Sequence, residues 1–369
     1  MKKINKVEDV DKNMTSKVED PNALVYRSPK KNKKLKVEGL AFFEQEKRYF
    51  RIPTSYKGKV TDAVYWLAGH PSGGQIRFKS DANKISVRIK SSGEYIMPHM
   101  AKTGQQGVDL YYKGKGQRKY NFYTSTKFTV PATNIEAVVF ESDTKDVRNF
   151  IINLPLYQNM DDIEIGINKD AKLYKPTSHK NKGRVVIYGT SVTQGGCAAR
   201  PGMSFTNILS RKLDKEFINL GFSGSGLGEK ELADIINLID DVDLIILDYE
   251  ANGGATGDMK NNLEPFIDTL RNKSKTVPIL VLSKIPFSVD AFNKKGMDHR
   301  KFYYDFQKDM VAKKIKEGDK HIYFLDGNNL FGNVDVDEMT VDGYHPTDLG
   351  FYMMAKNLEK PIKNLLKNG

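Results

Sequence analysis

Residues 184–203 read RVVIYGTSVTQGGCAARPGM, and this stretch decides the fold of the second half of the chain. It opens on a short apolar run at 185–188, bounded by a charge before it and by Gly189 after it. Such runs are typical of strands buried on both faces of a parallel sheet. Ser191 follows where the chain turns toward a helix, beside backbone N–H groups that lack a helical partner. This place suits a nucleophile, although a serine that merely caps the helix would look the same.

Beyond this stretch, short apolar runs alternate with helical patterns as far as the C-terminus. Strands that alternate with helices indicate a parallel sheet covered on both faces, so we predict an α/β domain over 184–369. The predicted strands are 185–188, 217–220, 244–247, 279–282 and 322–325, and the predicted helices are 204–213, 230–239, 261–271, 300–315 and 349–366.

The first half has the texture of an all-β domain, which we place at 23–165. Short runs of alternating apolar and polar residues are separated by turn residues, as at 71–74. Several short strands at this spacing predict a sandwich or a jelly roll. Residues 1–22 are predicted to be a disordered basic tail, and 166–183 a linker. The strands predicted in this half are 48–52, 63–67, 75–78, 84–89, 108–112, 120–123, 137–140 and 149–154.

The chain of 369 residues carries a formal charge of +12. Half of it lies in residues 1–36, where eleven basic side chains face five acidic ones, an excess of six. No aromatic residues are interleaved with the lysine run at 30–36, and no nucleic-acid module follows it. We therefore expect no nucleic-acid partner, because such a run is usually a solvated tail.

Cysteine, histidine and apolar content exclude further classes. Six histidines and the single Cys197 lack the spacing of a zinc site, so no metal is expected, and one cysteine cannot form an internal disulfide. No run approaches the roughly 18 apolar residues that cross a bilayer, so no membrane span is expected. The start, MKKINKVEDVDKN, lacks the apolar core of a signal peptide. We expect a cytoplasmic protein, or an exported one if a leader has been removed.

Four segments place polar or glycine residues just after a predicted strand, where open α/β sheets hold their sites. They are 189–191 (GTS), 219–226 (NLGFSGSG), 248–254 (DYEANGG) and 341–346 (VDGYHP). Together they supply a hydroxyl, an imidazole with a carboxylate three residues away, a side-chain amide and exposed backbone N–H groups. This is a complete set of groups for acyl transfer.

The roles follow from the chemistry of each group. His345 is expected to take the proton of Ser191 and return it to the leaving group, while Asp342 orients the imidazole. The N–H groups of Ser191 and Gly224 and the side-chain amide of Asn252 are expected to form the oxyanion hole.

In this order, the Gly-Thr-Ser, Asn-x-Gly-x-Ser-Gly, Glu-Ala-Asn-Gly and Asp-x-x-His blocks resemble those of the SGNH hydrolases, the GDSL esterase superfamily. The resemblance implies a flavodoxin-like three-layer α/β/α fold and an esterase or acyltransferase activity without a cofactor. The chain departs from the family pattern at Thr190, where the family name has Asp, and at 250–253, where Glu-Ala-Asn-Gly replaces Gly-x-Asn-Asp.

The first half carries a second resemblance. Residues 97–100 (MPHM) and 107–111 (GVDLY) look like the GxDLY β-sandwich domain that precedes a subset of SGNH hydrolases. That pairing resembles two-domain esterases and acyltransferases, several of which act on acylated carbohydrates. It implies a sandwich packed against the catalytic domain.

Four further residues have two interpretations each. His99 either lines the cleft or is a buried strand residue, and Arg200 either binds a substrate carboxylate or anchors its loop. Glu250 is a candidate for the cleft or, with Asp248, for a metal pair that lacks a third ligand. Trp66 is expected in the sandwich core rather than on a sugar platform.

The function predicted from these residues is ester hydrolysis, with a small acyl group, acetyl above all, removed from a carbohydrate or similar ester. Two alternatives stay open. The same triad could transfer the acyl group to an alcohol other than water, since the difference lies in how well the cleft excludes water. The chain could also be an inactive carbohydrate-binding protein. The sequence does not indicate an oligomeric state.

Overall fold

The computed structural model describes residues 23–93, 97–130, 132–292, 294–332 and 336–368. The predicted tail, 1–22, lies outside these residues. Five parallel strands form the sheet of the second half, in the order β12-β11-β13-β14-β15. This is the flavodoxin-like order 2-1-3-4-5, as predicted. The strands are β11 (Arg184–Gly189), β12 (Glu216–Gly221), β13 (Val242–Asp248), β14 (Ile279–Leu282) and β15 (Ile322–Leu325).

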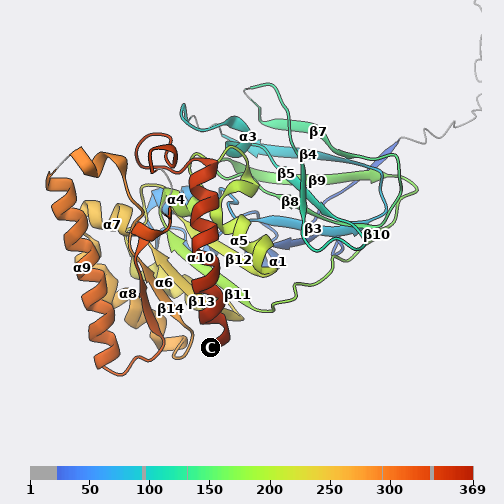
Figure 1. Cartoon of the computed structure of the whole chain (residues 1–369). Coiled ribbons are helices and arrows are strands. Elements are labelled where there is room, and N and C mark those ends of the chain that lie inside the picture. Colours follow the sequence, from blue (N-terminus) through green and yellow to red (C-terminus); the bar gives the residue numbers. More distant parts are fainter. Residues whose placement is uncertain (1–22, 94–96, 131, 293, 333–335, 369) are drawn as a thin grey trace, which may run out of the picture.

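Side chains alternate between the two faces of this sheet, and helices cover both faces (Figure 1). Val186 and Tyr188 of β11 share one core cluster with α6 (Lys230–Asn237), α8 (Met259–Lys273) and α9 (Lys294–Lys316). Val185 and Ile187 share another with α5 (Phe205–Leu213) and α10 (Asp348–Asn368). The three-layer α/β/α prediction is confirmed, and each predicted helix of this half is present.

The first half is a sandwich of two antiparallel sheets, as predicted (Figure 1). One sheet has the order β1-β9-β4-β7, and the other β10-β3-β8-β5-β6 with β2 beside β3. The bounds are β1 (Leu24–Arg27), β2 (Lys36–Glu38), β3 (Gln75–Ser80), β4 (Lys84–Ser92), β5 (Asp109–Lys113), β6 (Asn121–Ser125), β7 (Asn134–Glu141), β8 (Arg148–Asn153), β9 (Asn159–Asn168) and β10 (Leu173–Tyr174). The last residues of β9 and all of β10 thus lie in the segment predicted as a linker.

Two predicted strands of the first half are wrong. Residues 48–52 form no strand, and 63–67 lie in the helix α2 (Asp62–Ala68). The Thr61 side chain caps this helix by accepting a hydrogen bond from the N–H of Val64 at 3.3 Å. The buried residues of α2 are Val64, Leu67 and Ala68, a helical spacing rather than an alternation. Trp66, expected in the core, is 43% exposed.

The segment around α2 packs into the second half. Ile52, Val64 and Leu67 belong to the same core cluster as the strands β11 and β12. The fully buried Arg51 donates to the carbonyl oxygens of Asn219 at 3.4 Å and of Gly221, and it lies over the ring of Phe222. The segment around α2 is therefore part of the apolar core of the second half, while the sandwich keeps a core of its own.

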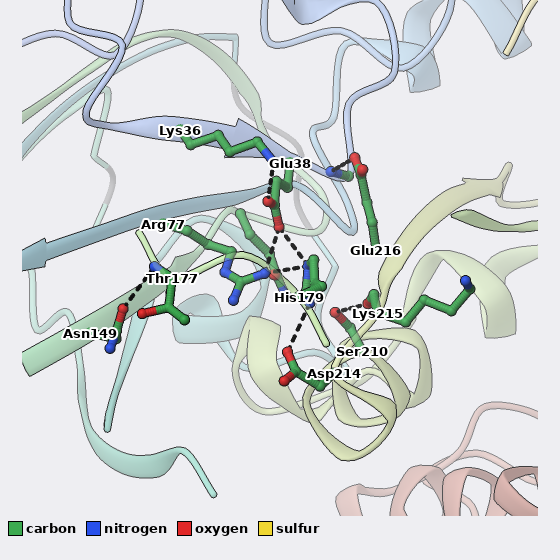
Figure 2. Close-up of polar contacts among 12 residues, drawn as sticks. Lys36, Glu38, Arg77, Asn149, Thr177, His179, Ser210, Asp214, Lys215 and Glu216 are labelled. Atoms are coloured by element: carbon green, nitrogen blue, oxygen red, sulfur yellow. Dashed lines mark hydrogen bonds and ion pairs between the residues drawn. The ribbon is translucent and has the colours of Figure 1, made fainter. Parts of the chain in front are cut away.

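A polar cluster joins β2 and β3 of the first half to the end of α5 in the second half (Figure 2). His179 contacts Glu38 of β2 through Nε2 at 2.8 Å and Asp214, at the end of α5, through Nδ1 at 3.0 Å. Arg77 of β3 donates to Glu38 at 2.8 Å. Burial opposes a charge on His179, but the hydrogen bonds to Asp214 and Glu38 outweigh it and raise its pKa.

Within the described residues, no helix has both the length and the apolar character to cross a membrane.

The remaining elements are short. The short α-helices are α1 (Phe43–Glu46), α3 (Lys102–Gln105), α4 (Ser191–Gln194) and α7 (Glu250–Thr256), and the 3₁₀ turns are Thr54–Tyr56, Pro201–Met203, Ser288–Phe292, Gly327–Asn329 and Val336–Glu338.

Candidate active site

Ser191 is the first residue of α4, directly after the central strand β11. The N-cap position belongs to Thr190, so the Ser191 side chain is not the cap of this helix. Its Oγ lies 2.9 Å from Nε2 of His345. From the sequence, Ser191 could be either a helix cap or a nucleophile. In the structure its hydroxyl contacts the imidazole of His345.

His345 and Asp342 lie on a turn that precedes α10. Nδ1 of His345 is 2.7 Å from Oδ2 of Asp342, while Oδ1 accepts the backbone N–H groups of Tyr344 at 3.0 Å and His345 at 2.8 Å. Burial raises the pKa of Asp342, but the hydrogen bonds from His345 and Tyr344 lower it by more, so the net pKa is below its usual value. The ionised carboxylate fixes the imidazole with its Nε2 lone pair toward Ser191.

Strand register brings the predicted oxyanion-hole residues to one edge of the sheet. Gly189 at the end of β11 pairs with Gly221 of β12 on one side and with Asp248 of β13 on the other. Gly224 follows β12, and Asn252 lies in α7, directly after β13. An N–H of Gly226 donates to Oδ1 of Asn252 at 3.4 Å and ties these two loops together.

Gly224 occupies a position that favours glycine. Its φ is +69°, and a Cβ there would meet nothing within 4 Å. The left-handed backbone therefore explains the glycine, and the residue itself is exposed.

Gln194 is a supporting residue that the sequence analysis missed. Its Nε2 donates to the carbonyl of Leu156 at 3.0 Å, and its Oε1 accepts the N–H of Ser223 at 3.0 Å. It thus fixes the glycine-rich turn relative to α4 and the sandwich. The residue stands in the stretch 184–203, but its partners come from distant segments, so no local pattern could reveal the role.

Of the three residues predicted as candidates for the cleft, His99 lies beside the triad. Its Nε2 is 3.8 Å from Oδ2 of Asp342, and its ring centroid is 5.7 Å from that of His345. Arg200 instead donates to Asp109 of β5 at 2.8 Å and to Tyr111 at 2.6 Å. This contact agrees with the alternative in which Arg200 anchors its loop.

Glu250 and Asp248 are buried carboxyls with partners of their own. Glu250 accepts the N–H of Lys284 at 2.8 Å and the amide of Gln307 at 2.7 Å, so it ties α7 to the end of β14 rather than facing the cleft. Burial raises its pKa. Asp248 accepts the hydroxyl of Thr193 at 2.7 Å, and burial raises its pKa to about 7.

Cys197 lies in the loop after α4, buried and with a φ of +75°. Burial, with the nearby charge of Asp342, raises the pKa of its thiol to about 12. The thiol is therefore protonated at neutral pH and is no rival to Ser191 as a nucleophile.

The geometry describes an α/β hydrolytic site of the serine type, and comparisons with known proteins place it in a family. Residues 182–363 match the GDSL-like lipase/acylhydrolase family, and residues 24–173 match GxDLY, the N-terminus of SGNH-hydrolase-type esterases. A GDSL-like lipase from Bacteroides ovatus ATCC 8483 is 31% identical, with a TM-score of 0.84 over 94% of this chain and 98% of that one. The chain belongs to the GDSL-like lipase/acylhydrolase family, an esterase family, and carries the GxDLY domain at its N-terminal side.

More distant solved structures share the fold. The salicylyl-acyltransferase SsfX3, from a tetracycline biosynthetic pathway, is 19% identical, with a TM-score of 0.76 over 93% of this chain and 97% of that one. A family two carbohydrate esterase from Clostridium thermocellum, in complex with cellohexaose, is 16% identical, with a TM-score of 0.60 over 80% and 93%. No curated protein sequence matches the chain significantly.

Proposed function

We propose that this esterase removes small acyl groups, acetyl above all, from a carbohydrate or a similar small ester. The observation that carries the proposal is the continuous hydrogen-bond chain from Ser191 to Asp342, with steps of 2.9 and 2.7 Å through His345. Such a chain gives a hydroxyl a base within reach and gives that base a fixed orientation.

The reaction has two halves. Oγ of Ser191 attacks the ester carbonyl while Nε2 of His345 takes its proton, and the alcohol then leaves with that proton. Water attacks the resulting acyl-enzyme in the same way, and the carboxylic acid leaves as Oγ regains its proton. Backbone N–H groups of Ser191 and Gly224 and the amide of Asn252 hold the oxyanion. Each such donor contributes about 10²–10³ in kcat.

Replacing Ser191 by Ala tests the chemical part of the proposal. We expect the hydrolysis of an aryl acetate to fall by about 10⁴-fold or more, with the unfolding midpoint unchanged. Ser274→Ala is the matched control, because Ser274 ends α8 at the other edge of the sheet. Retention of more than a few per cent of the wild-type rate by Ser191→Ala would exclude Ser191 as the nucleophile.

An exposed aromatic surface supports a carbohydrate substrate. Trp66, Tyr65 and Phe50 line a hollow of about 450 Å³ together with polar groups that include Asn159. The apolar faces of sugar rings stack on such side chains. Trp66 contacts His70 at a centroid distance of 4.6 Å, and His70 lies 3.3 Å from Nε2 of Gln194, which supports the glycine-rich turn. The resemblance to the cellohexaose-binding esterase points to the same substrate class.

Trp66→Ala separates this substrate class from a simple ester. We expect KM for an acetylated oligosaccharide to rise severalfold, up to about tenfold, because a stacked aromatic ring contributes roughly 0.5–1.5 kcal/mol. The rate on an aryl acetate should stay within about twofold, and equal effects on both substrates would refute the sugar platform.

Acyl transfer to an alcohol is the second candidate, and the whole-chain likeness to SsfX3 favours it. The same assay decides between the two reactions if a sugar alcohol is added as acceptor. Formation of the new ester in excess of the free acid would favour the transferase, and no turnover on any ester would favour an inactive binding protein.

A further inference from the structure

Three side chains with metal-binding atoms meet beside the triad. His99 comes from the segment before α3, Cys197 from the loop after α4, and His345 from the turn before α10. A ring nitrogen of each histidine and Sγ of Cys197 all lie within 4.8 Å of one another. Across the part of the chain that the structure describes, no other three histidine, cysteine or acidic side chains converge in this way.

The chemistry of this set selects one class of cation. Imidazole and thiolate bind Zn²⁺ and similar borderline ions, whereas Mg²⁺ and Ca²⁺ require oxygen ligands. A tetrahedral zinc with nitrogens at about 2.0–2.1 Å and sulfur at about 2.3 Å holds its ligand atoms roughly 3.3–3.8 Å apart. The group must therefore contract by about 1 Å at its widest. His99 can supply this movement, because about a third of its side chain is exposed.

The surroundings already resemble those of a metal-bound histidine. Such histidines usually donate their second ring N–H to a carboxylate, and Nδ1 of His345 lies 2.7 Å from Oδ2 of Asp342. The other ring nitrogen, Nε2, lies 2.9 Å from Oγ of Ser191, so a cation bound at Nε2 would replace the hydrogen bond from the serine. Asp342 also lies 3.8 Å from Nε2 of His99, so a negative charge stands beside one of the three candidate ligands.

We propose that His99, Cys197 and His345 form a binding site for Zn²⁺ or a cation of its class, and that the bound cation reversibly blocks the esterase. The cation replaces the thiol proton of Cys197, which passes to solvent, and occupies Nε2 of His345. Oγ of Ser191 or a water completes the tetrahedron. His345 then cannot accept the proton of Ser191, so the first step of hydrolysis stops. The inhibition rests on the proposed function, whereas the binding does not.

Co²⁺ is the probe that tests binding without any enzyme assay. The full chain, stripped of metal and kept reduced, is titrated with Co²⁺ while the thiolate-to-cobalt charge-transfer band in the near ultraviolet is recorded. We expect the band to saturate at one ion per chain and to vanish when Zn²⁺ is added. Cys197→Ser should abolish it. His99→Gln should weaken binding more than about tenfold, since loss of even an outer-shell partner typically costs 10–100-fold.

His321→Gln is the matched control, because His321 precedes β15 at the opposite edge of the sheet. This variant should give the wild-type band. Thermal unfolding of each variant without metal checks that the fold is kept. An absent band in the folded wild-type chain, or a wild-type band in Cys197→Ser, would overturn the site.

The second readout is inhibition of aryl acetate hydrolysis by Zn²⁺, with each variant compared with its own metal-free rate. We expect EDTA to restore the wild-type rate, and the inhibition constant to rise more than about tenfold in Cys197→Ser and His99→Gln. Wild-type inhibition in both variants would overturn the proposed blockade. A cobalt band in a chain that hydrolyses no ester would refute the proposed function and support the metal site. Ester hydrolysis by a chain that gives no cobalt band would support the proposed function and refute the metal site.

Discussion

Asp248 is a buried carboxyl at the end of β13, where it accepts the hydroxyl of Thr193. Burial raises its pKa to about 7, the bond from Thr193 opposes this shift, and the charge of Glu250 adds to it. The folded chain therefore holds a proton that the unfolded chain releases near pH 4. The resulting stability is present below pH 4 and is lost as the pH rises to about 7.

Asp248→Asn should remove this part of the pH dependence. The amide keeps an acceptor for Thr193 but carries no charge. We expect the free energy of unfolding of the wild type to fall by a few kcal/mol between about pH 4 and pH 7, and that of the variant to fall by less. Urea unfolding at several pH values measures the difference, and parallel curves for the two proteins would contradict it.

For single residues, the sequence predicts those that stand in its motifs. It misses the roles of residues whose partners are distant in the sequence. Ser191, Asp342 and His345 stand in recognisable blocks, and the structure joins them by hydrogen bonds. The anchoring contacts of Arg200 and Glu250 depend on Asp109 and Gln307, which no spacing in the chain connects to them. Such pairings arise from tertiary packing alone.

Among the elements, the buried parallel strands were the easiest to predict. β14 and β15 both have the predicted bounds. All four residues of β14 are buried, and a strand buried on both faces is a continuous apolar run. The strand predicted at 63–67 was wrong because a short apolar run, AVYWL, fits a strand and a helix alike. The cap at Thr61 and the burial of Val64 and Leu67 decide for the helix.

The short helix α3 presses against the loop that follows α4. A Cβ on Gly104 would lie 2.0 Å from the carbonyl oxygen of Ala198, next to Cys197. Gly104→Ala should therefore displace this loop, lower kcat/KM severalfold and reduce the free energy of unfolding by about 1–3 kcal/mol.

Gly114→Ala is the control for this change, because its new Cβ would meet Gln117 at an ordinary 3.6 Å. Its stability should stay within about 0.5 kcal/mol of the wild type, as for most exposed substitutions. If Gly104→Ala behaved like Gly114→Ala in chemical denaturation and in turnover, the close packing of α3 on the loop would be refuted.

On the scale of the whole molecule, His179 makes the joint between the halves depend on pH. Its raised pKa means that the contribution is complete below about pH 6.5 and is lost as the pH rises through the folded pKa. The pKa values of Glu38 and Asp214 are lowered, by the hydrogen bond from His179 in both carboxyls, although burial opposes the shift. The stability that Glu38 and Asp214 contribute is lost only in acid. Near neutral pH, therefore, only the protonation of His179 changes the stability of this cluster.

His179→Gln should lower the free energy of unfolding by about 1.5–3 kcal/mol at pH 6, the usual contribution of a hydrogen bond to a charged group, and by less at pH 8. Urea unfolding at both pH values measures this, with His321→Gln as the control. An equal loss at pH 6 and pH 8 would show that the charge on His179 does not stabilise the joint.

The packing of α2 into the core of the second half also constrains how the chain folds during translation. Arg51 and α2 complete their packing only against β11 and β12, and Asn219 is 168 residues beyond Arg51. At 5–20 residues per second, the ribosome needs roughly 10–30 s to make that distance. Throughout this interval the apolar side of α2 lacks its partners in the second half, so we expect the first half to aggregate when it is expressed alone.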